Sequence, residues 1–185
     1  MKLFMVLLGC TPEGRNTEQH DIFFGIADSL PALVPQLKAF WPGKHPLHID
    51  AWREINRVGE YSIQVHARNT KQAINNITRL YFINLGGYKP GDFEEYHYKL
   101  LIAADSKSEA IREAKNSIFY KHTGFKGAES HVDDKYGIDI DDSYQIEELL
   151  SADTLQQFSI SILPNTTEKE DSLQIGYTKL SSLSL

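Results

Sequence analysis

The chain has 185 residues, of which 41% are hydrophobic, 24% charged and 11% aromatic. This composition is typical of a globular protein and excludes a collagen, a coiled coil and a disordered chain. With 19 basic and 25 acidic side chains the formal net charge is −6, which argues against a nucleic-acid partner, because phosphate binding needs a basic surface. No run of 18 apolar residues suggests a membrane span. The single cysteine, Cys10, fits a reducing compartment, so we expect a cytoplasmic protein.

The first half of the chain predicts alternating strands and helices. Hydrophobic periodicity and β-branched content predict the strands Lys2–Leu8, His20–Ala27, His48–Ile55 and Glu60–His66. A helix is expected after Ser29, where Pro31 suits the first turn and Pro35 should shorten or bend the helix. A short helix is expected at Thr70–Thr78.

The second half predicts a similar series of elements. The expected strands are Leu80–Leu85, His97–Ala104, His131–Ile140, Tyr144–Glu147, Phe158–Leu163 and Leu173–Leu180. A longer helix should begin at Ser106, because Ser106 and Glu109 have the spacing of a capping box. A short helix is expected at Ala152–Gln157.

The similarity of the two halves extends to identical residues. A shift of 77 residues aligns Phe4–Ser29 with Tyr81–Ser106 without a gap, and a shift of 83 aligns His48–Ile63 with His131–Ile146. The matched pairs that carry polar chemistry are Glu18 and Glu95, His20 and His97, His48 and His131, and Asp50 and Asp133. We therefore expect an internal duplication, with a first repeat at 1–79, a second repeat at 80–157, and C-terminal strands and a tail at 158–185.

The order of elements from His20 onward is that of a split β-α-β unit. The predicted fold class is α+β: a tandem duplication of a ferredoxin-like (ββαββ) unit, with mainly antiparallel sheets packed into one pseudo-symmetric body. Strand Leu80–Leu85 could be the last strand of the first unit or the first strand of the second. Several strands are apolar on both faces, so each sheet should be covered on both, with a homodimer through a sheet face as one way to achieve this.

Glu-x-His and His-x-Asp pairs carry the candidate chemistry. They are Glu18 with His20 and His48 with Asp50 in the first repeat, and Glu95 with His97 and His131 with Asp133 in the second. Residues two apart on a strand point to the same face, so two histidines and two carboxylates could meet and bind Zn, Mn or Fe(II), or transfer protons. Hydrogen bonding of strand ends to turn amides is the simpler interpretation and is preferred. No cofactor is therefore expected, with a divalent metal as the alternative.

Four other candidate residues of the first repeat have no counterpart in the second: Arg15, Asn16, Trp52 and Arg53. Arg15 could bind a carboxylate or phosphate, whereas a solvated turn explains it more simply. Trp52 and Arg53 could line a pocket beside His48, although Trp52 would equally suit the core.

Two further features receive simpler interpretations. Cys10 with His20 would make a thiol nucleophile, a weaker hypothesis because Gly87 replaces the cysteine in the second repeat. The acidic run from Asp133 to Asp142 lacks the ligand spacing of an EF-hand and is expected to be a solvated hairpin.

Several segments together resemble a known family. Phe4–Gly9, Gly14–Asp21, His48–Arg53 and Phe82–Tyr88, with Phe93-Glu94-Glu95-x-His97, resemble an uncharacterised bacterial family, the domain of unknown function 1543 (DUF1543). The resemblance covers about residues 2–150 and includes a layout of one or two copies. It implies a bacterial cytoplasmic protein and supplies no activity, substrate or cofactor.

Two functional hypotheses follow. The first is a duplicated module that binds a small molecule or another protein. The alternative is a small hydrolase-like or lyase-like enzyme, with or without a metal, that uses Glu18, His20, His48 and Asp50, with Arg15 as an anion anchor. A site shared by these residues requires that the side chains of His20 and His48 converge on one face of a sheet.

Overall fold

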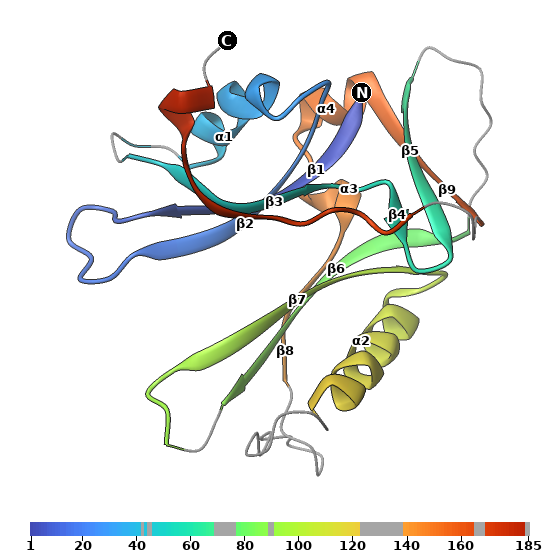
Figure 1. The fold of residues 1–185 in the computed structure, drawn as a ribbon. Coiled ribbons are helices and arrows are strands. Elements are labelled where there is room, and N and C mark those ends of the chain that lie inside the picture. The colour runs from blue at the N-terminus through green and yellow to red at the C-terminus, as the bar shows by residue number, and fades with distance from the viewer. Residues whose placement is uncertain are drawn as a thin grey trace. The chain divides into compact units, whose positions relative to one another are not determined.

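The computed structural model describes residues 1–41, 43, 46–68, 77–88, 91–122, 139–164 and 169–183. The chain forms two compact units (Figure 1): unit 1 consists of Met1–Ile74 and Leu149–Leu185, and unit 2 of Asn75–Glu148. Both units combine antiparallel strands with helices, which confirms the predicted α+β class. No helix in the described part of the chain is long and apolar enough to cross a membrane.

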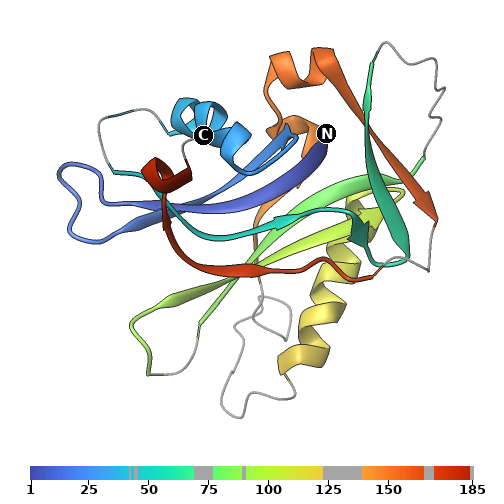
Figure 2. The same cartoon turned by 45° about the horizontal axis from the view of Figure 1, so that its top comes forward.

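A four-stranded antiparallel sheet forms the centre of unit 1. Its order is β10-β3-β1-β2, built from β10 (Gln174–Lys179), β3 (His48–Glu54), β1 (Lys2–Cys10) and β2 (Gln19–Ala27). Figure 2 shows β10 alongside β3, so the expected C-terminal strand is confirmed. β1 can occupy a central position because both of its faces are apolar and largely buried.

One face of this sheet is covered by three short helical segments. These are η1 (Pro31–Leu33), α1 (Val34–Phe40) and η2 (Leu180–Leu183). Leu33, Leu37 and Leu180 pack against strand residues such as Phe4 and Leu8 to form the core. Pro31 begins η1 and Pro35 lies in the first turn of α1, so the helical segment is divided and α1 has only seven residues, as expected.

A second antiparallel sheet of unit 1 has the order β4-β5-β9. Its strands are β4 (Arg57–Val58), β5 (Tyr61–Ala67) and β9 (Phe158–Pro164). Helix α4 (Ala152–Gln157) precedes β9, where it was expected, and the hydroxyl of its N-cap Ser151 accepts a hydrogen bond from the amide of Thr154. The pairing of β9 with β5 and of β10 with β3 joins the expected C-terminal strands to strands of the first repeat, and the repeat boundaries 1–79, 80–157 and 158–185 stay a prediction.

Unit 2 contains one three-stranded sheet and one long helix. The sheet has the order β7-β6-β8, built from β7 (Glu95–Ala104), β6 (Arg79–Tyr88) and β8 (Asp139–Gln145). Helix α2 (Lys107–His122) lies along the sheet in both views, and its Ala110 and Ala114 pack against Ile83 and Leu85. The amide of Glu109 donates to Ser106 Oγ over 3.2 Å, which is the expected helix cap. Helix α3 (Ile146–Leu149) follows β8.

The strand pairing differs from that of a ferredoxin-like unit. Leu80–Leu85 belongs to β6, which pairs with β7 and β8, so it is the first strand of the unit 2 sheet along the chain. Asp139–Gln145 forms one continuous strand where two strands joined by a turn were expected, because these residues pair with β6. The helix expected at Thr70–Thr78 lies mostly outside the described residues.

The strand sets β2-β1-β3 and β7-β6-β8 share order and register. Gly9 pairs with His20 and His48, and Gly86 pairs with His97 and Asp139. Residue numbers therefore differ by 77 between β2 and β7, as expected, but by 91 between β3 and β8 (His48 and Asp139). The expected shift of 83 is wrong for this strand. A tandem duplication stays a prediction.

Candidate metal centre

Three strands bring four polar side chains together on one face of the unit 1 sheet. Gly9 in β1 pairs with His20 on one side and with His48 on the other. Residues that pair directly across antiparallel strands share a face, so both imidazoles lie on the face of Gly9. Glu18 is two residues before His20, immediately before β2 begins. The geometric condition for a shared site is therefore met.

The donor atoms of these side chains face one another at short distances. His48 Nε2 lies 3.1 Å from Glu18 Oε1 and 3.4 Å from Asp50 Oδ2. His20 Nε2 lies 3.5 Å from Glu18 Oε2 and 3.3 Å from Asp50 Oδ2. One ligand atom from each of Glu18, His20 and His48 falls within 4.8 Å of the others. These four residues are called the unit 1 cluster below.

A β-bulge explains why Trp52 does not join the cluster. Asp50, two residues after His48, shares its face by ordinary alternation. Leu8 pairs with Ile49 and Leu7 pairs with Ala51, so Asp50 is an extra residue in β3, and the bulge interrupts the alternation beyond it. Trp52, which pairs with Val6, therefore lies on the opposite face and packs against the core.

Gly9 supplies the space that the cluster occupies. A Cβ atom at this position would lie 2.7 Å from Asp50 Oδ2 and would also overlap His48 Nε2. Any larger residue at position 9 would push the side chains of His48 and Asp50 away from β1. The sequence alone does not indicate this role of Gly9, because the role depends on the pairing of β1 with β3.

The cluster has one buried and one open side. His48 is 4% exposed and its ring stacks on Tyr177 of β10, with the ring centroids 4.5 Å apart. The side chains of Glu18 and His20, in contrast, are 44% and 43% exposed. Asp50 Oδ2 is buried and has no hydrogen-bond partner in the structure. Solvent or a ligand can therefore reach the cluster from the side of Glu18 and His20.

Two imidazoles and two carboxylates make a donor set that metals use. Zn²⁺ in catalytic sites binds three protein side chains, for example two histidines and a glutamate, and keeps a further position open. Fe(II) uses two histidines and one carboxylate in a similar way. Glu18, His20 and His48 supply such a set, and Asp50 adds a second carboxylate within reach of both imidazoles.

Of the other candidates in the first repeat, Arg15 and Asn16 lie in a loop and Arg53 lies on the same sheet face as the cluster. Arg15 and Asn16 are exposed in the loop between β1 and β2, where the Arg15 amide donates to Pro12 O over 3.1 Å in a turn. Arg53 pairs with Met5 and lies on the cluster's face, further along β3. Burial lowers the pKa of Arg53, and the nearby Asp171 carboxylate opposes this shift.

Cys10 cannot act with His20 as a nucleophile pair. It follows Gly9 in β1, so its side chain points to the face opposite that of His20. Burial, followed by the negative charge of Glu18, raises the pKa of the thiol. A buried, protonated thiol is a poor nucleophile, so the hypothesis of a reactive cysteine is wrong.

Unit 2 brings together a related set of residues, but not the set expected. His97 Nε2 lies 3.2 Å from Asp141 Oδ2 and 3.9 Å from Glu95 Oε2, so Glu95 and His97 do meet. His131 and Asp133 lie outside the described residues, and the register assigns Asp139 and Asp141 to the positions of His48 and Asp50. Asp141 was expected in a solvated hairpin. The shared sequence Ile-Asp, at 49–50 and 140–141, was the signal that could have identified it.

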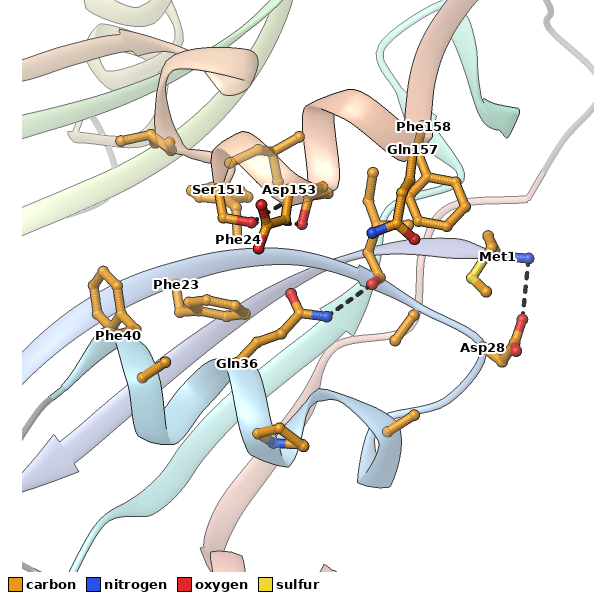
Figure 3. A pocket seen from close by; sticks show the side chains of 18 residues that line it. Met1, Phe23, Phe24, Asp28, Gln36, Phe40, Ser151, Asp153, Gln157 and Phe158 are labelled. Carbon is orange, nitrogen blue, oxygen red and sulfur yellow. Dashed lines mark hydrogen bonds and ion pairs between the residues drawn. The ribbon is translucent and has the colours of Figure 1, made fainter. Parts of the chain in front are cut away.

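A separate pocket of about 740 Å³ lies in unit 1 beside β2 (Figure 3). Phe23, Phe24 and Phe40 line it together with residues of Leu149–Phe158, and Gln36 Nε2 donates to Ile26 O over 3.0 Å at its margin. No residue of the unit 1 cluster lines this pocket. The polar chemistry and this pocket are therefore distinct features.

Comparison with known proteins finds one matching family model and similar solved structures. Residues 15–65 match the family model described as Domain of Unknown Function (DUF1543), which confirms the resemblance over a segment containing all four cluster residues. No curated protein matches the chain. The crystal structure of a protein Il1583 from Idiomarina loihiensis is similar, with 23% identity, 97% of each chain covered and a TM-score of 0.65. This likeness shows a shared fold.

Proposed function

We propose that unit 1 binds a divalent transition-metal ion and that the protein is a metal-dependent ligand-binding module. The ion would be held by Glu18, His20 and His48, with Asp50 beside them. The convergence of both Nε2 atoms and a Glu18 carboxylate oxygen within 4.8 Å carries the proposal. It replaces the interpretation in which these residues only form structural hydrogen bonds.

The environment of Asp50 supports a cation over a hydrogen-bonded network. An unsatisfied buried polar atom costs about 1–3 kcal/mol, more when it is charged. Asp50 Oδ2 is such an atom, and its nearest partners are the Nε2 atoms of His20 and His48 at 3.3 and 3.4 Å. A cation bound among these atoms would satisfy the carboxylate and both imidazole lone pairs at once.

The donor set favours Zn²⁺ or another ion that accepts imidazole. Imidazole suits Zn, Fe, Cu and Ni, whereas sites for Mg and Ca use oxygen ligands. Toward the middle of β1 the next register positions on the cluster's face are apolar, because Leu7 pairs with both Ile22 and Ala51, whereas on the β10 side Lys179 pairs with His48. An apolar surround strengthens the interaction between an ion and its ligands, because fewer dipoles compete.

The open side of the cluster defines the class of ligand. Three protein ligands leave at least one coordination position free, and the exposed side chains of Glu18 and His20 border it. We propose a small molecule with a carboxylate, hydroxyl or amine donor that binds there.

We also propose a cytoplasmic location, supported by a single cysteine, since disulfides are rare in that compartment.

Metal analysis tests the proposal. The protein, purified without a histidine tag, is dialysed against Zn²⁺ and then against metal-free buffer, and its zinc content is measured. We expect about one tightly held equivalent, lost in the double variant Glu18→Gln/His20→Ala and kept in Glu13→Gln, which removes an exposed charge from the same loop. Less than about a tenth of an equivalent in the wild-type protein would contradict the proposal.

A metal-dependent hydrolase is the second candidate, favoured by one observation. Asp50 lies beside both imidazoles but is not needed to complete a three-ligand set, so its carboxylate could act as a base near a free coordination position. Zinc-loaded protein would then hydrolyse activated esters or phosphodiesters, and Asp50→Asn would lose this activity while it retains zinc. Equal rates for the two proteins would exclude the enzyme.

A further inference from the structure

We propose that unit 2 carries a second, weaker metal site of different selectivity, formed by Glu95, His97 and Asp141 and suited to Mn²⁺. One ligand atom from each of the three residues falls within 4.8 Å of the others. His97 Nε2 lies 3.2 Å from Asp141 Oδ2. This inference rests on the side chains of unit 2 and does not require that unit 1 binds a metal.

The backbone around these residues repeats the arrangement that gathers the unit 1 cluster. Leu85 pairs with Ile140 and Asn84 with Asp142, so Asp141 is the extra residue of a β-bulge in β8. A Cβ atom on Gly86 would lie 2.9 Å from Asp141 Oδ1 and would also overlap Oδ2. A glycine and a bulge thus place a carboxylate beside a histidine in this unit too.

The donors of unit 2 are harder than those of unit 1. The set has one imidazole and two carboxylates, and the register position of the second imidazole is taken by Asp139. Mn²⁺ and Mg²⁺ prefer carboxylate, carbonyl and water oxygens, whereas Zn²⁺ gains more from imidazole. One retained imidazole favours Mn²⁺ over Mg²⁺, since affinities for nitrogen donors are higher for transition metals.

An unsatisfied oxygen on the same sheet face supports a cation at this site. Asn84 lies two residues before Gly86 in β6, and its Nδ2 donates to Asp142 Oδ2 over 3.2 Å. Its Oδ1 is buried and makes no hydrogen bond in the structure. Amide oxygens suit the water shell that Mn²⁺ retains, because they accept hydrogen bonds from it.

The site should be weaker than that of unit 1 because none of its three ligands is buried as His48 is. The side chains of Glu95, His97 and Asp141 are 40%, 36% and 30% exposed, so water competes for the ion and screens the carboxylates. The unit 1 cluster, in contrast, contains the buried ring of His48.

Electron paramagnetic resonance of free Mn²⁺ tests this inference in the full chain. Glu18→Gln/His20→Ala removes the unit 1 cluster and leaves unit 2 unchanged. We expect this variant to bind about one equivalent of Mn²⁺, and the further change His97→Ala or Asp141→Asn to raise the dissociation constant at least tenfold. The matched control Glu94→Gln removes a neighbouring exposed charge and should leave binding unchanged. Circular dichroism confirms that each variant is folded.

The two proposals fail separately. Absence of Mn²⁺ binding by Glu18→Gln/His20→Ala at millimolar concentration, or binding that survives both His97→Ala and Asp141→Asn, would overturn the second site. Zinc binding by Glu95→Gln/His97→Ala depends only on unit 1. If that variant holds no zinc while the Mn²⁺ result is as expected, the proposed function fails and the second site stands.

Discussion

The sheets of units 1 and 2 use the same backbone plan for two different chemical environments. Both have a central glycine, a Glu-x-His segment and a bulge that adds an aspartate. In unit 1 the next register positions on the same face are apolar, with Leu7 and Ala51 paired. In unit 2 the corresponding pair is Asn84 and Asp142. A shared scaffold can therefore present either an imidazole-rich, apolar site or a carboxylate-rich, polar one.

This difference separates the features that build the backbone of the site from the features that would determine which ligand it binds. The glycine leaves the space beside the central strand that the side chains occupy. If the two sites bind metals as proposed, the residue at the His48 or Asp139 position and the polarity of the surrounding pairs should decide which ion is preferred. Substitutions that exchange these features between the two units test the comparison directly.

The largest effect is expected from His20→Ala. Loss of a direct ligand should lower the affinity for Zn²⁺ at least about 100-fold, more than the 10–100-fold typical of groups that only orient ligands. Isothermal titration with Zn²⁺ measures this. His66→Ala is the matched control, because His66 bonds Ser161 in another sheet of unit 1. A change of less than threefold for His20→Ala would remove His20 from the site.

The next effect concerns the space beside the central strands. Gly86→Ala should lower the Mn²⁺ affinity of unit 2 about tenfold, because the new methyl group displaces the Asp141 carboxylate, the mobile end of a partly exposed side chain. Gly87→Ala is the control, since its Cβ would meet nothing within 4 Å. Mn²⁺ titration in the Glu18→Gln/His20→Ala background compares the two. Equal affinities would show that Gly86 does not make room for the carboxylate.

Exchange of the distinguishing ligand should move the selectivity of unit 2 toward that of unit 1. Asp139→His introduces an imidazole at the register position of His48. We expect Zn²⁺ affinity at unit 2 to rise about tenfold, equivalent to ~1.4 kcal/mol, and Mn²⁺ affinity to fall. Titrations in the Glu18→Gln/His20→Ala background isolate this site. Unchanged preference would mean that this position does not determine selectivity.

The smallest effect is expected from the ring that covers His48. Tyr177→Leu removes the stacked aromatic side chain, whose centroid lies 4.5 Å from that of His48. Aromatic pairs contribute about 0.5–1.5 kcal/mol, and at an exposed position we expect about a threefold loss of Zn²⁺ affinity. Competition with a chromophoric zinc chelator resolves a change of this size. A loss above about 100-fold would instead assign Tyr177 a direct role at the metal.

Local patterns predicted much of the fold. Strands β1 and β2, the short helix at Pro31 and Pro35, and helix α4 were expected from periodicity and from residues with fixed conformations. The pairing of β9 with β5 and of β10 with β3 could not be predicted, because these contacts join residues about 90 to 130 positions apart. Such contacts depend on tertiary packing, which strand patterns do not encode.

The sequence predicted which residues form the unit 1 cluster, but not how the residues of β3 and β8 pair with the central strands. Glu18, His20, His48 and Asp50 were selected by their spacing, and the structure brings them together. Strict alternation along β3 would have put Trp52 on the same face, and only the bulge moves it into the core. The expectation of His131 and Asp133 in place of Asp139 and Asp141 has another cause, because the different length of the connection before β8 hides the true shift.

X-ray absorption at the zinc edge tests the central claim most directly. The variant Glu95→Gln/His97→Ala, loaded with one equivalent of Zn²⁺, reports only on unit 1. We expect two imidazole ligands with Zn–N distances of about 2.0–2.1 Å, the remaining positions being oxygen, and one imidazole fewer after His20→Ala. A spectrum without imidazole, or two imidazoles that persist after His20→Ala, would contradict a metal centre formed by Glu18, His20 and His48.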